Sequence, residues 1–126
     1  MTKQTAGYVD GYVLVVPKDK VSIYKKMAQL GAKTWMKHGA LDYKECMIDD
    51  MDPAHVTFTF GKMTKLKPGE TVWFSYINFK SKKHRDEVNK KVMADPAMND
   101  PKWKDIPMPM DMKRFAYGGF KVVVSA

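Results

Sequence analysis

The chain has little cysteine and no long apolar run. Cys46 is its one cysteine, so no disulfide can form within the chain, which agrees with a reducing compartment. No stretch approaches the ~20 apolar residues that a membrane-spanning helix needs, so no membrane partner is expected. Residues 1–7 also lack the apolar core of a signal peptide. Together these absences predict a cytoplasmic location.

Arginine is scarce among the positive charges. Lys and Arg total 22 against 14 Asp and Glu, a formal net charge of +8, yet only Arg85 and Arg114 are arginine. Nucleic-acid sites rely on arginine for bidentate contacts with bases and phosphates, whereas scattered lysine is typical of a solvated surface. The composition therefore favours a solvated lysine surface, and weak nucleic-acid binding through this basic surface is kept as an alternative.

Sequence motifs for metal or cofactor chemistry are absent as well. His38, His55 and His84 form no H-x-H or H-x-x-x-H pair. No glycine-rich phosphate loop precedes a helix, so neither a metal nor a cofactor is expected. Cys46 follows Glu45, and a neighbouring carboxylate disfavours the reactive thiolate. A core cysteine is therefore favoured over a nucleophile.

Four stretches have the composition of β-strands: residues 8–16, 41–48, 71–79 and 113–124. The first and third stretches are nearly apolar at every position, so we expect them at the centre of a sheet with both faces covered. Gly118 and Gly119 within the last stretch indicate a bulge or a close approach of another group to the backbone.

Two stretches predict helices, residues 18–38 and residues 81–94. In the first, apolar residues recur at steps of three and four, and Gly39 is the expected stop. Ser81 is the expected N-cap of the second. Residues 56–60 are compatible with a short extended piece, and residues 61–68 with a turn or a short helix.

The order strand, helix, strand, strand, helix, strand predicts an α+β, ferredoxin-like βαββαβ sandwich with an antiparallel four-stranded sheet. The length of 126 residues predicts one such domain over 1–126. Two helices cover only one sheet face, and a second copy of the chain is the simplest cover for the other. We expect that face to carry some combination of Tyr12, Leu14, Trp73 and Ile77. In a monomer, residues 56–67 or 96–112 would have to cover it.

The candidate site residues are mostly charged, namely Asp10, Glu45, Arg85, Asp86, Lys113 and Arg114. Asp10 lies in an apolar strand, and a buried carboxylate needs a cation or several donors. One of the cations in the set could supply the charge, and a structural salt bridge is the favoured interpretation. The alternative is a ligand pocket between sheet and helices, lined by Tyr8, Asp10, Trp35, His38 and Glu45.

Several short motifs occur in a characteristic order, including Tyr8-Val9-Asp10-Gly11, Val16-Pro17-Lys18-Asp19-Lys20, His38-Gly39-Ala40-Leu41, Arg85-Asp86-Glu87-Val88-Asn89, Val92-Met93-Ala94-Asp95-Pro96 and Tyr117-Gly118-Gly119-Phe120. Across residues 8–124 the chain resembles the bacterial YbaA-like family, domain of unknown function 1428. The resemblance implies a dimeric α+β barrel, in which two ferredoxin-like subunits pair sheet to sheet. It implies no established activity.

The function classes left open are therefore a small dimeric ligand-binding or sensing protein and, by fold analogy alone, a cofactor-independent or haem-degrading monooxygenase. Haem-degrading proteins of the dimeric barrel group place a Trp on the third strand and a His on the following helix. Trp73 and His84 could imitate these two residues. Tyr8 and Asp10 stand where those proteins carry an Asn, which weakens the match.

Overall fold

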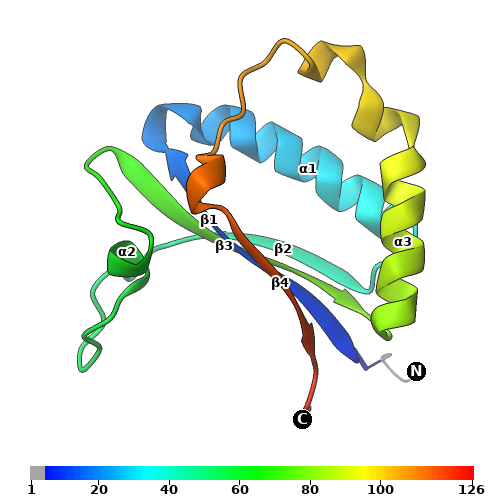
Figure 1. Cartoon of the computed structure of the whole chain (residues 1–126), viewed down its shortest axis with the longest axis horizontal. Helices are drawn as coiled ribbons and strands as arrows, with labels where there is room; N and C mark the ends of the chain where they lie inside the picture. The colour runs from blue at the N-terminus through cyan, green and yellow to red at the C-terminus, as the bar shows by residue number, and fades with distance from the viewer. Residues whose placement is uncertain (1–4) are drawn as a thin grey trace.

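The structure is a computed structural model that describes residues 5–126 and shows a twisted sheet with helices packed on one face (Figure 1). The strands are β1 (Tyr8–Pro17), β2 (Asp42–Met47), β3 (Glu70–Phe79) and β4 (Ala116–Lys121). Their order in the sheet is β2-β3-β1-β4, and every pairing is antiparallel. The helices α1 (Val21–Lys37) and α3 (Lys82–Ala94) supply the other layer. This is the predicted ferredoxin-like arrangement.

The ends of the two long helices follow their local sequence. A 3₁₀ turn, η1 (Lys18–Lys20), leads into α1, and Gly39 follows the helix with a φ of +110°, in the left-handed region that favours glycine. Ser81 Oγ accepts a hydrogen bond from the backbone N–H of His84 at 3.1 Å, which satisfies a free donor of the first turn of α3. Both the predicted stop and the predicted cap are confirmed.

Two segments differ from the sequence-based expectation. The short helix α2 (Phe60–Met63) forms where a turn or short helix was expected, but residues 56–59 form no strand. The last strand is shorter than the predicted 113–124 at both ends: Met112–Arg114 forms the 3₁₀ turn η4 before it, and it ends at Lys121. Asp111 caps this turn by accepting the backbone N–H of Lys113 at 2.9 Å. The chain therefore turns sharply before it enters the sheet.

The core lies between the sheet and the two long helices. One cluster beneath α1 contains Leu14, Val16, Tyr24 and Trp73. A second cluster beneath α3 contains Ala40, Ile77, Phe79, Val88 and Val92. The expectation that Tyr12, Leu14, Trp73 and Ile77 occupy the uncovered face is wrong, since all four point toward the helices. Both faces of β1 and β3 are apolar, so alternation alone could not tell the inner face from the outer one.

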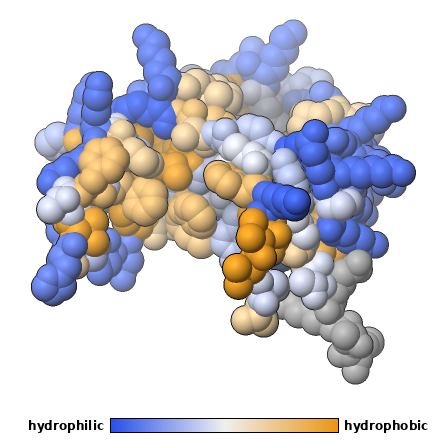
Figure 2. All heavy atoms as spheres, turned by 60° about the horizontal axis from the view of Figure 1, so that its bottom comes forward, coloured by the Kyte–Doolittle hydropathy of each residue, from blue (hydrophilic) through white to orange (hydrophobic). Residues whose placement is uncertain are grey.

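The opposite face, called the outer face here, carries Val9, Val13, Phe74, Tyr76 and Phe120, by their register across β1, β3 and β4. Phe74 is 45% exposed and Phe120 is 60% exposed. Figure 2 shows apolar side chains gathered in a hollow on the underside of the sheet. One copy of the chain therefore covers the inner face of both central strands and leaves most of their outer face open, so the expected cover by a second copy stays a prediction.

Neither segment expected to cover this face in a monomer does so completely. The segment around α2 lies below the sheet, opposite α1 (Figure 1), where one end of the outer face contains the buried Val15 and Val72. Residues 96–112 lie on the helix side instead, where Met98 and Met110 line a cavity beside α1. Cys46 is exposed, so the core-cysteine prediction is wrong. The reason is that β2 is an edge strand with an open outer face.

Candidate functional site

A cavity of about 220 Å³ lies between α1, the sheet and the chain segment that follows α3. Its wall is almost entirely apolar and aromatic, formed by Tyr12, Leu14, Tyr24, Met27, Ala28, Gly31, Trp35, Tyr43, Glu45, Ser75, Ile77, Met98, Met110 and Phe115. Glu45 is the one charged side chain among these described residues. The cavity therefore combines a mostly apolar wall with a single acidic group, which is typical of small-molecule sites.

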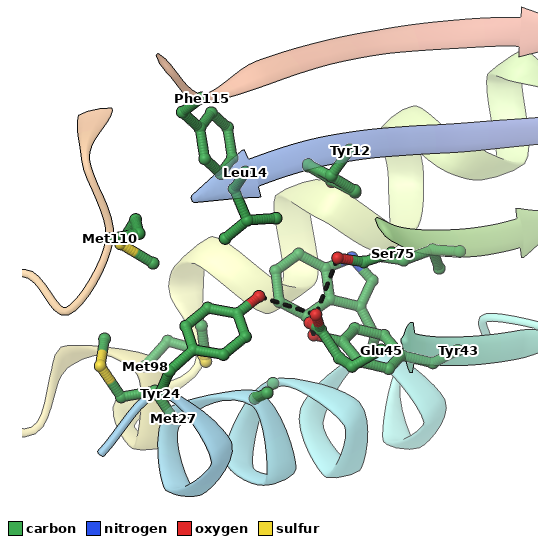
Figure 3. Close-up of a pocket in the computed structure, with 14 residues that line it drawn as sticks. Tyr12, Leu14, Tyr24, Met27, Tyr43, Glu45, Ser75, Met98, Met110 and Phe115 are labelled. Atoms are coloured by element: carbon green, nitrogen blue, oxygen red, sulfur yellow. Dashed lines mark hydrogen bonds between the residues drawn. The ribbon is translucent and has the colours of Figure 1, made fainter. Parts of the chain in front are cut away.

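Hydroxyl groups from three elements hold the Glu45 carboxylate. Tyr24 Oη and Ser75 Oγ each donate to Oε1 at 2.7 Å, and Tyr43 Oη donates to Oε2 at 2.7 Å. Figure 3 shows these hydroxyls directed toward the carboxylate beside the open cavity. The strand geometry explains the convergence: Tyr43 and Glu45 are two residues apart on one face of β2, and Ser75 stands directly opposite Glu45 on β3.

Burial and the charge of Glu45 raise the pKa of both Tyr24 and Tyr43 well above the ordinary value of 10.0. Both phenols therefore stay protonated around neutral pH and act as donors to the carboxylate. Within residues 5–126, the cavity wall contains no lysine, arginine or histidine. The charge of Glu45 is thus stabilised by neutral hydroxyl groups instead of a counter-ion.

A second polar cluster lies beside this cavity, beneath α3. Asp10 is fully buried, accepts a hydrogen bond from Arg85 Nη1 at 2.9 Å and accepts another from Tyr117 Oη at 3.1 Å. Burial raises the pKa of Asp10, and the charge of Arg85 partly offsets this effect. The Arg85 guanidinium also lies over the ring of Tyr8, 5.0 Å from its centroid. The favoured prediction of a salt bridge beside the core agrees with this geometry.

The backbone at Gly119 lies directly beneath the Tyr8 phenol, so that a Cβ at this position would overlap the Tyr8 ring. This is the close approach that the paired glycines predicted, and the β1–β4 register continues through Gly118 and Gly119 without a bulge. Without a side chain at Gly119, the Tyr8 ring can reach the position in which Arg85 stacks on it.

Trp35 and Asn89 connect the two clusters. Trp35 lines the cavity, and its indole Nε1 donates to Asn89 Oδ1 at 3.0 Å. The Asn89 side chain also lies near Asp10 and lowers its pKa, although to a smaller extent than burial raises it. Oδ2 of Asp10 still has no well-formed hydrogen bond within the described residues. A movement of the Trp35 side chain in the cavity could therefore be transmitted to Asp10 through the Asn89 side chain.

The structure divides the predicted site residues between several places. Trp35 and Glu45 line the cavity, while Tyr8, Asp10 and Arg85 form the neighbouring cluster.

Two more predicted site residues lie outside both places. Asp86 is 58% exposed at its side chain and pairs with Arg85 Nε at 2.8 Å. His38 caps the end of α1, where its Nε2 lies 2.7 Å from Asp95 Oδ2. His38 therefore ties the end of α1 to the end of α3 and does not line the predicted pocket.

The last two predicted residues are also separate from the cavity. Arg114 makes a paired contact with Glu70, at 2.8 Å and 2.6 Å, and a further bond from Nε to Asp111 at 2.8 Å. The hydrogen bond from Arg114 lowers the pKa of Glu70 to about 2. Lys113 is exposed. Arg114 thus anchors η4 to the start of β3.

Sequence reasoning missed most of the cavity wall, notably the hydroxyls of Tyr24, Tyr43 and Ser75. The spacing of Tyr43 and Glu45 placed them on one strand face, and Tyr24 belonged to the apolar stripe of α1. Only the sheet register and the packing of α1 bring the three hydroxyls to one carboxylate.

The residues proposed to imitate a haem-degrading site are not brought together. Trp73 packs against Tyr24 with ring centroids 4.9 Å apart, whereas His84 contacts Phe79 at 5.9 Å. Trp73 and Phe79 are six residues apart on one strand, which corresponds to roughly 20 Å.

Within residues 5–126, no group of three or more potential ligands is arranged to hold a metal, and no helix is long and apolar enough to cross a bilayer.

Comparison with known proteins finds uncharacterised bacterial relatives. The family profile described as "Protein of unknown function (DUF1428)" matches residues 7–112. The chain is 40% identical over 117 residues to the protein described as uncharacterized protein YbaA of Escherichia coli strain K12, covering 93% of this chain and 97% of the relative. The YbaA protein of Shigella flexneri shows the same identity and coverage. Neither description names an activity.

Proposed function

The chain belongs to the bacterial DUF1428 family, and the descriptions of the family and of its relatives name no activity. We propose from the geometry of the chain that it is a ligand-binding protein whose small-molecule ligand occupies the cavity beneath α1. The observation that carries this proposal is the Glu45 carboxylate, held by three hydroxyl groups at the edge of unfilled apolar space. Protein interiors are normally close-packed, and a charge in an apolar site is costly. A bound ligand would account for both features.

The size and wall of the cavity support a compact ligand. Its volume of about 220 Å³ is below the roughly 300–1,000 Å³ of pockets for drug-sized molecules. Met27, Met98 and Met110 contribute flexible, polarizable side chains, which adapt to ligands of different outline. The wall therefore suits a small, mainly apolar molecule.

The proposal is tested by screening compounds of about ten non-hydrogen atoms, a size that permits millimolar binding. Amines, alcohols and acids are each represented in the panel. Binding is followed through the labelled methyl groups of Met27, Met98 and Met110. We expect at least one class to shift these signals, and Ala28→Phe, which fills the cavity, to abolish the shift. Ser22→Phe is the matched control, because Ser22 is exposed on the same helix.

Two results would contradict the ligand-binding proposal. One is that no member of the panel binds more tightly than about 1 mM, which corresponds to about 4 kcal/mol. The other is that Ala28→Phe binds the panel as well as the wild-type protein does, which would place the binding outside the cavity.

We further infer that two copies of the chain pair through their outer faces. The supporting observation is the exposure of Phe74 and Phe120 in the apolar hollow, because monomers rarely expose apolar patches above a few hundred Å². An interface of this kind usually buries about 2,000 Å² or more. Sedimentation should give a dimer at micromolar concentration, and Phe74→Lys should weaken it. The exposed Met36→Lys on α1 is the control, and a monomeric wild-type protein would contradict the pairing.

Cytoplasmic location and weak nucleic-acid binding stay predictions from the sequence. Nucleic-acid binding through a lysine surface would weaken steeply as salt rises, because binding releases counter-ions from the phosphates. Titration of a labelled RNA at several salt concentrations measures this dependence.

A further inference from the structure

We propose that the cavity beneath α1 takes a compact organic cation, in which an ammonium group joined to an apolar body is held at Glu45. This inference rests on the ligand-binding proposal and adds the chemical class of the ligand.

The Glu45 carboxylate has room for one more donor. A carboxylate offers about four acceptor positions. Oε1 accepts from Tyr24 and Ser75, whereas Oε2 accepts from Tyr43 alone. A position on Oε2 therefore stays open beside the cavity. An N–H group of a ligand would complete the set, and a charged donor would form a stronger bond than a neutral one.

The cavity also lacks a positive charge. Its three donors to Glu45 are neutral hydroxyls, and no residue from 5 to 126 forms an ion pair with Glu45. Lys25 and Lys44 line a neighbouring groove that Glu45 and Tyr43 also line. Among residues 5–126 neither lysine forms an ion pair with Glu45, and Lys44 is paired with Asp42 at 2.6 Å instead. A cationic ligand would supply the missing counter-charge, whereas an anion would meet Glu45 without any compensating group.

The rest of the wall favours the same class of ligand. Aromatic rings surround the space, contributed by Tyr12, Tyr24, Trp35, Tyr43 and Phe115. Ammonium groups are attracted to the faces of such rings, most strongly where water is excluded. The methionine side chains and Leu14 would contact an apolar body. Charge, hydrogen bonding and wall composition therefore point to one ligand chemistry.

The test compares three probes that share a phenyl group and differ in their polar end: 2-phenylethylamine, 2-phenylethanol and phenylacetate. Affinities are measured by calorimetry at pH 7 and physiological salt, where weak surface attraction is screened. We expect the amine to bind roughly tenfold more tightly than the alcohol, since hydrogen bonds to charged groups are the stronger ones. Phenylacetate should bind least.

Matched variants locate the effect at one residue. Glu45→Gln keeps the shape of the side chain and should remove most of the preference for the amine while leaving the alcohol nearly unaffected. Glu87→Gln removes the same charge from an exposed position on α3 and should change nothing. If Glu45→Gln does not fold, Ser75→Ala serves instead. It keeps the carboxylate and frees an acceptor position, so the amine should bind at least as tightly.

The outcomes distinguish a failure of the cationic ligand class from a failure of the ligand-binding proposal on which it rests. If amine and alcohol bind equally to the wild-type protein and both are lost in Ala28→Phe, the cavity binds ligands but the cationic class is wrong. If the amine preference persists in Glu45→Gln, or disappears in Ser75→Ala, the role of Glu45 is wrong. If none of the three probes binds, the cationic class is again wrong, and the broader compound panel then decides whether the cavity binds any ligand.

Discussion

Replacing Asp10 by Ala tests whether the buried ion pair beneath α3 stabilises the fold. The change leaves the Arg85 guanidinium, only 13% exposed, without its partner at 2.9 Å. Losing one member of a buried pair costs about 3–5 kcal/mol when the other charge stays buried. Arg85 keeps a second partner, since its Nε lies 2.8 Å from Asp86, so we expect the lower end, about 3 kcal/mol.

Urea unfolding measures this cost, and thermal unfolding should show a fall in Tm of roughly 10 °C. Asp86→Ala is the matched control, because it removes an exposed partner of the same guanidinium and should cost less than about 1 kcal/mol. The double variant Asp10→Ala/Arg85→Met should recover part of the loss, because no charge is then left unpaired. A cost below about 1 kcal/mol for Asp10→Ala would refute the reasoning.

Asp10 should also make the stability of the fold depend on pH. Burial raises the pKa of Asp10 in the folded protein above its ordinary 3.8. The folded state then binds more protons than the unfolded state in the interval above pH 3.8, so stability should fall as pH rises through that interval. Asp10→Asn cannot titrate, and its unfolding free energy should lack this component.

Two further predictions concern the start of β3 and the edge strand β4. Arg114 lowers the pKa of Glu70 from 4.5 to about 2, so this pair should stabilise the fold above pH 4.5 and lose its effect as pH falls toward 2. In urea unfolding across that range, Glu70→Gln should lose less unfolding free energy on acidification than the wild-type protein does. An identical loss would contradict the role of this pair. Gly119→Ala would overlap the Tyr8 ring and should cost about 1–3 kcal/mol, with partial recovery when Tyr8→Ala is added; a neutral Gly119→Ala would show that the ring moves aside freely.

Local sequence signals determined the elements and their order. Strands and helices follow side-chain periodicity and a few caps and stops, such as Ser81 and Gly39, which act within a few residues of their position. The order of these elements leaves few ways to build a sheet with helices on one face. The fold class could therefore be read before any contact between distant residues was known.

The sequence also indicated that Asp10 needs a buried partner, because a lone carboxylate in an apolar strand is too costly to leave unpaired. It could not choose that partner from Arg85, Lys113 and Arg114. The choice depends on which cation the packing of α3 places over β1. Arg85 is the one that reaches Asp10, while Arg114 is held by Glu70.

Only the tertiary structure decided which sheet face is open and where the cavity lies. Alternation along β1 and β3 contains no information about inside and outside when both faces are apolar. The Glu45 site joins residues of α1, β2 and β3, and Tyr24 and Ser75 are 21 and 30 positions from Glu45 in the chain. Such convergence is set by strand register and helix packing. Sequence spacing describes only neighbours within one element, so it could place Tyr43 beside Glu45 but could not bring Tyr24 or Ser75 to the same carboxylate.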